Sequence, residues 1–136
     1  MREIAQVIMR IARDVVAIDR VNDICRLLFE SRDAAHLWHL QTDSYAMHKA
    51  LNVYYDGILT LADTFLESAQ GLFGNMKGGY GVEIADYKDV EQIRDHLNEL
   101  REMLGQHRTS FPNELQNVID EMMALIDQTL YLLTLE

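Results

Sequence analysis

Three histidines and two carboxylates lie in one part of this sequence at spacings that suit a metal site. His36, His39 and His48 fall within thirteen residues of each other, and Asp63 and Glu67 follow. Imidazole and carboxylate groups together form a ligand set that iron, zinc and manganese accept. The residue types therefore predict a metal site, with iron as the first candidate and zinc or manganese as the alternatives.

Apolar residues at helical spacing place these side chains on long helices. The pattern predicts helices over about residues 4–38, 43–70, 89–107 and 112–133, with Gly71 and Gly74 ending the second one. It leaves open whether the first helix breaks near Asp19. Residues 74–89 are rich in glycine and are expected to form a loop. Because no strand pattern occurs, we expect a single all-α domain over residues 1–136, an up-down four-helix bundle with an extra N-terminal helical segment.

Composition and charge exclude several classes of function. The formal net charge is −10, and phosphate backbones are bound mainly by clustered cations, so nucleic-acid binding is not expected. No apolar stretch reaches the length that crosses a membrane, and the N-terminal residues do not resemble a signal peptide. The single cysteine, Cys25, is consistent with a reducing compartment. We therefore expect a soluble cytoplasmic protein.

The second predicted helix carries the polar groups on one stripe. With about 100° per residue, Asn52, Asp63 and Glu67 fall within about 100° of His48. His48 and Asp63 are nevertheless about 22 Å apart along the helix axis, so one ion cannot contact both in the same chain. Two copies of the helix, packed antiparallel across a two-fold axis, would bring His48 of one copy beside Asp63 and Glu67 of the other.

Apolar residues next to this stripe point to a partner. They lie away from the core stripe of Met47, Leu51, Ile58 and Phe65, and an apolar patch opposite a core commonly marks an interface. The sequence therefore predicts a homo-oligomer built on a two-fold dimer. The residues of this second apolar face are Tyr55, Leu59, Ala62 and Leu66.

The spacing of His48, Asp63 and Glu67 resembles the ferroxidase motif of Dps-type mini-ferritins, and the short chain is similar to the abbreviated relatives of that family in bacteriophages. His39 occupies the place of the family's first histidine. His36 is the alternative, because it keeps the family's full interval to His48. We prefer His39, and the two lie one helical turn apart.

This resemblance implies a ferritin-like fold and a ferroxidase site between two subunits, in which Fe(II) is oxidised by peroxide or oxygen and stored in a dodecameric shell. One departure argues against fast oxidation, because Asn52 stands where the family usually has a carboxylate, and an amide is the weaker iron ligand. The alternative is a non-catalytic ferritin-like oligomer with a degenerate metal site.

Overall fold

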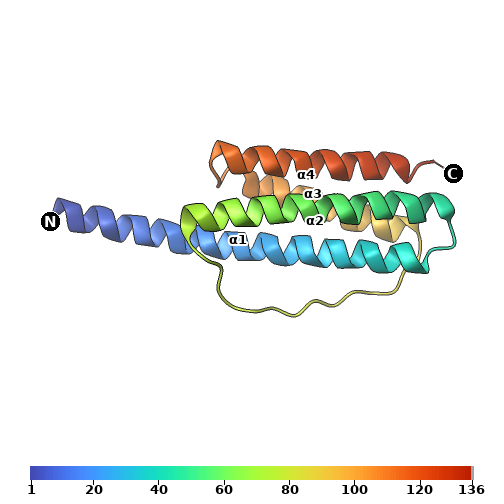
Figure 1. Ribbon diagram of the computed structural model, residues 1–136, viewed down its shortest axis with the longest axis horizontal. Coiled ribbons are helices and arrows are strands. Elements are labelled where there is room, and N and C mark those ends of the chain that lie inside the picture. The colour runs from blue at the N-terminus through green and yellow to red at the C-terminus, as the bar shows by residue number, and fades with distance from the viewer. Residues whose placement is uncertain (136) are drawn as a thin grey trace.

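The computed structural model describes residues 1–135 and contains four helices: α1 (Arg2–Gln41), α2 (Tyr45–Phe73), α3 (Val90–Arg108) and α4 (Asn113–Leu132) (Figure 1). No strand occurs in this part of the chain, so the all-α prediction is confirmed. α1 continues unbroken through Asp19. The extra N-terminal segment is the first part of α1, which extends beyond the ends of the other helices (Figure 1).

The ends of the helices follow local capping chemistry. The Ser44 hydroxyl accepts a hydrogen bond from the Met47 amide at the start of α2, and the Asp89 carboxylate accepts one from Gln92 at the start of α3. Gly74 ends α2 with a φ of 103°, which favours glycine. Gly71, predicted to end α2, lies inside it. Pro112, the first residue of the predicted helix over about residues 112–133, directly precedes α4.

Each helix packs against two antiparallel neighbours, in the cyclic order α1, α2, α4, α3 (Figure 1). α2 and α3 lie on a diagonal and run in the same direction, so the chain must return along the bundle between them. Residues 74–89, the crossover, make this return along α1. None of the helices in the described residues is long and apolar enough to cross a membrane.

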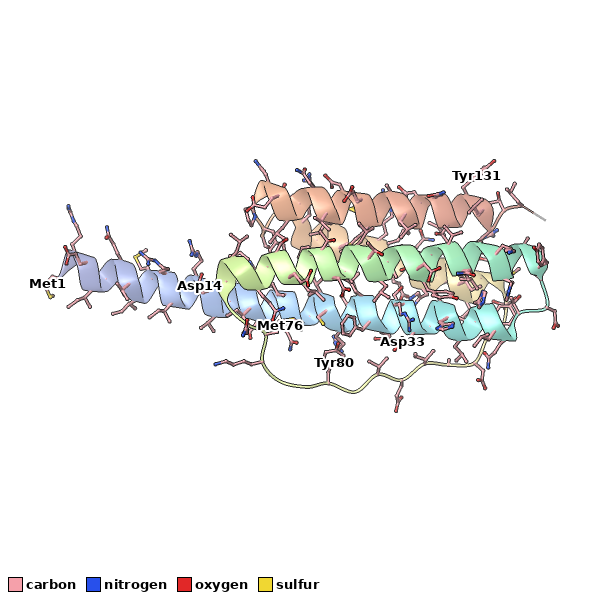
Figure 2. All side chains as sticks on the ribbon, viewed as in Figure 1. Met1, Asp14, Asp33, Met76, Tyr80 and Tyr131 are labelled. Carbon is pink, nitrogen blue, oxygen red and sulfur yellow. The ribbon has the colours of Figure 1, made fainter. Side chains whose placement is uncertain are left out.

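Side chains of α1 hold the crossover in place. The Trp38 indole donates to the Ala85 carbonyl at 2.9 Å. The Gln41 amide donates to Asp86 at 3.0 Å and accepts from the Tyr87 amide at 2.6 Å. Tyr80 points from the crossover towards α1 (Figure 2). These contacts hold the crossover against α1, although the crossover has no helix or strand of its own.

The prediction that a second apolar face of α2 contacts another subunit is wrong for Ala62 and Leu66, because both are buried inside their own subunit. α2 packs against both α1 and α4, so it needs two apolar stripes within one chain. Tyr55 is half-buried, and Leu59 alone of the four is exposed. On the α4 side, Gly57 allows close approach, because a Cβ atom there would lie 2.9 Å from Leu125 Cδ2.

A chain of hydrogen bonds crosses the core between three helices. The Tyr54 hydroxyl of α2 lies 2.5 Å from Ser31 Oγ of α1, which lies 2.9 Å from His96 Nε2 of α3. Tyr54 and Ser31 are fully buried, and burial raises the pKa of Tyr54 above its ordinary value. Burial lowers the pKa of His96 to about 4, so this imidazole is neutral at pH 7. All three groups are therefore uncharged and paired.

We expect Ser31→Ala to lower the free energy of unfolding by about 1–3 kcal/mol, because it leaves the Tyr54 hydroxyl and His96 Nε2 buried without their shared partner. Urea denaturation measures the change. Tyr54→Phe should cost less than Ser31→Ala, since Ser31 and His96 remain paired. Ser68→Ala, at an exposed serine, serves as the surface control. A loss in Ser31→Ala no larger than in this control would contradict the interpretation.

His96 should also make stability depend on pH. Its folded-state pKa, about 4, lies below the value of about 6.5 expected in the unfolded chain. Between these values the unfolded state binds the proton and the folded state does not. The stabilisation is therefore complete above about pH 6.5 and is lost as the pH falls to about 4, by up to about 3 kcal/mol.

The measurement is urea denaturation at several pH values between about 7 and 4.5, within this window. His96→Gln should flatten the slope, because glutamine does not titrate, whereas His107→Gln on the same helix is the matched control. An unchanged slope in His96→Gln would mean that His96 is not the group responsible.

Candidate metal centre

His39 and His48 face each other where α1 turns into α2. His39 lies in the last turn of α1 and His48 in the first turn of α2, with only residues 42–44 between the helices. The Nδ1 atom of His39 lies 2.6 Å from the His48 carbonyl, and Nδ1 of His48 lies 2.8 Å from the His39 carbonyl. The rings stack with centroids 3.7 Å apart and planes 16° apart. The two residues thus clamp each other.

This clamp fixes the tautomer of both rings. A backbone carbonyl can only accept, so Nδ1 carries the hydrogen on His39 and on His48. In a neutral imidazole the other nitrogen, Nε2, then keeps its lone pair. A hydrogen bond from Nδ1 to a carbonyl is also the support that proteins commonly place behind a metal-binding imidazole. The arrangement therefore offers two supported Nε2 atoms as ligands.

Further rings extend the histidine pair along the face shared by α1 and α2. His36 stacks on Tyr55 with centroids 4.3 Å apart and planes 13° apart. Tyr55 also meets His39 edge-on at 5.3 Å, and the Arg32 guanidinium lies 5.7 Å from the Tyr55 centroid. His36 lies 6.1 Å from His39 between ring centroids, so it is adjacent to the pair without joining the clamp.

The remaining candidate residues lie along α2 on its exposed side. Asn52 is half-buried, and its amide donates to Asp56 Oδ2 at 2.9 Å. Asp63 and Glu67 are exposed and lie one turn apart. At 1.5 Å per residue they are about 22 Å or more from His48 along the axis. Within residues 1–135, no group of three or more His, Cys, Asp or Glu side chains is placed to hold a metal ion.

Tyr55 and Arg32 lie beside the histidines, although the sequence pattern did not predict either residue as part of the site. The sequence did contain a spacing signal for both residues, because Tyr55 follows His48 by two helical turns and Arg32 precedes His36 by one turn. Each spacing shows only that two residues share a face of one helix. That the α1 face meets the α2 face depends on how the helices pair, which the spacing does not contain.

A sequence profile of DUF5856, a family of unknown function, matches residues 39–133. The chain belongs to this family. The matched residues include His39, His48, Asp63 and Glu67. The chain is also similar to an uncharacterised 14.6 kDa protein from the mobD–ri intergenic region of Enterobacteria phage T4, with 27% identity over 125 residues that cover 86% of this chain and 90% of the relative. No solved structure matches the chain.

The assignment to the Dps-type mini-ferritins is therefore wrong: the matching family and the phage relative carry no ferritin description. The motif behind it was short, and one histidine and two acids at helical spacing recur on the polar face of many helices. The dodecameric shell and iron storage that the resemblance implied stay predictions.

We expect nuclear magnetic resonance to find hydrogen on Nδ1 and none on Nε2 for both His39 and His48 in the metal-free protein at neutral pH. Long-range ¹H–¹⁵N spectra of the imidazoles separate the two tautomers, and His107, which makes no such clamp, provides the internal comparison. A hydrogen on Nε2 of either clamped ring would show that the reciprocal bonds do not form in solution.

Proposed function

We propose that this protein is a homo-oligomeric helical bundle that binds a divalent transition metal, iron or alternatively zinc or manganese, at a two-fold interface between subunits. His39 and His48 of one subunit would supply nitrogen ligands. Asp63 and Glu67 of the partner subunit would supply the oxygen ligands. His36 and Asn52 lie at the edge of this set.

The observation that carries the proposal is the reciprocal clamp of His39 and His48. It holds two rings in fixed orientation, and neither Nε2 atom has a hydrogen-bond partner in residues 1–135, although His39 itself is buried. For a metal site, the same arrangement removes the cost of ordering the ligands before the ion arrives.

The partner is needed because one chain does not complete the site. The carboxylates lie too far along α2 to reach the histidines of their own subunit, and they face outwards. An antiparallel pairing of two α2 helices would move them to the opposite histidine pair. It would also cover Leu59, which is exposed on the same side one turn before Asp63. A two-fold contact of this kind forms two equivalent sites.

We further propose a ferritin-like arrangement of the bundle. Its support is the connectivity, with one long crossover between the second and third helices and short turns elsewhere. Di-iron bundles of this class draw a Glu from each of two helices and a Glu-x-x-His motif from each of the others, and the sequence contains no Glu-x-x-His. We therefore infer metal binding with slow oxidation of Fe(II) rather than an efficient ferroxidase.

The test is titration with Zn(II), Mn(II) and anaerobic Fe(II), followed by calorimetry and by sedimentation. We expect binding that favours the dimer, because an ion shared by two subunits stabilises their association. His48→Gln and Glu67→Gln should each weaken affinity by at least about tenfold, since each removes one proposed ligand. Binding should also fade in acid, where the ligands take up protons.

Glu121→Gln, at an exposed acid on α4, is the matched control and should bind as wild type does. Oxidation of Fe(II) by peroxide, followed by absorbance, separates a slow ferroxidase from a binding site. Equal metal affinity in wild type, His48→Gln and Glu67→Gln would end the proposal.

A further inference from the structure

The first part of α1, residues 2–16, projects from the bundle as an arm with an uncovered apolar face. In Figure 2, the labels of Met1 and Asp14 show where the arm projects beyond the other helices. Large apolar side chains that would normally be buried are more than half exposed here. They are Met9 at 70% and four β-branched residues, Ile4 at 62%, Ile8 at 61%, Ile11 at 58% and Val15 at 53%.

The four β-branched residues follow the spacing of a coiled-coil seam. Their separations alternate between four and three residues, which keeps them on one narrow stripe of the helix. The opposite side is mainly polar, with Arg2, Gln6, Arg10 and Arg13, and Met9 is the apolar exception there. A helix of this length is marginal in water by itself, and packing of an apolar face is the usual source of its stability. The arm is therefore built to pack against something outside its own bundle.

We propose that the arm pairs with the arm of a second copy of this chain as an antiparallel two-helix coiled coil. One antiparallel register places Ile4 opposite the partner's Val15, and Ile8 opposite the partner's Ile11. The two-fold symmetry repeats both pairs with the two copies exchanged, so each of the four residues of the stripe has a partner. Ala5 and Ala12 flank the stripe on one edge, where small side chains let two helices approach closely.

A parallel pairing would match the same stripe but is blocked by the crossover. The stripe's face continues along α1 to Cys25 and Phe29. Tyr80 of the crossover already covers it there, with its hydroxyl 3.4 Å from Cys25 Sγ and its ring 6.5 Å from that of Phe29. Two parallel copies would press these covered faces together. Antiparallel copies place the bundles at opposite ends of the arm pair.

Net charge argues against an anionic membrane as the occupant. Amphipathic helices that lie on membranes rely partly on attraction between basic residues and anionic lipids. The arm contains three arginines against two acids, but the whole chain carries −10, so such a surface would repel the bundle. A second copy adds no such penalty, since antiparallel arms keep the acidic bundles apart. Two heptads form a small interface, so we expect a dissociation constant on the order of micromolar.

Sedimentation over a concentration series tests the pairing with the full-length protein. Ile8→Asp should shift association through the arm to at least about tenfold higher concentration, because it buries a charge in the seam. Gln6→Asp introduces the same side chain on the polar side and should associate as wild type does. The arm lies outside the bundle, so at concentrations where the wild type is also monomeric both variants should keep its circular dichroism spectrum and unfolding midpoint.

Disulfide trapping separates this contact from any dimer formed through α2. In a Cys25→Ser background, Ile8→Cys mixed with Ile11→Cys should oxidise mainly to the mixed dimer, which mass spectrometry identifies. Trapping of Ile8→Cys with itself alone would indicate parallel arms and overturn the proposal. Absence of any trapping would also overturn the proposal. If the wild type then pelleted with phosphatidylglycerol vesicles, the arm would bind a lipid surface; if it did not, the arm would be unpaired.

Discussion

The hydroxyl group of Tyr54 has to find a hydrogen-bond partner inside the core, because a buried polar group without one costs about 1–3 kcal/mol. Ser31 reaches it from α1, and His96 completes the chain from α3. Apolar contacts alone would tolerate small shifts of one helix along another. A hydrogen bond does not, since it weakens steeply with distance and angle. This chain of hydrogen bonds therefore sets the axial register of three of the four helices, α1, α2 and α3.

The register at Ser31 and Tyr54 determines where the histidines meet. From Ser31 to the end of α1 at Gln41 is ten residues, and from the start of α2 at Tyr45 to Tyr54 is nine. Both distances are about 15 Å, so the two helices end level and three residues suffice to join them. His39 and His48 then lie opposite each other near the turn. The clamp between them is a consequence of core packing, and any chemistry at the site depends on the same hydrogen bonds that align the core.

The sequence predicted the helices well because their signals are local. Ser44 and Asp89 cap helices close to the starts predicted at about residues 43 and 89, and the glycine-rich stretch forms the crossover. The side of each helix that meets another helix is a long-range property. The stripe with Ala62 and Leu66 has the pattern of an interface between subunits, but α2 buries it within its own chain because this helix has two neighbours. For the same reason His39 and His48 could be named as ligands, while their reciprocal bonds and the stacking of Tyr55 could not.

The two proposed contacts lie on different parts of the subunit, which constrains the assembly they would form together. One uses the exposed side of α2 within the bundle, and the other uses the arm beyond it. Each contact is two-fold, and a subunit with two distinct two-fold contacts cannot stop at a dimer unless one of them is left empty. If the two axes intersect at a right angle, the assembly closes as a tetramer of dihedral symmetry; if they do not intersect, it extends as a chain. Since the first turns of α1 touch no other helix, the direction of the arm rather than the packing of the core selects between these outcomes.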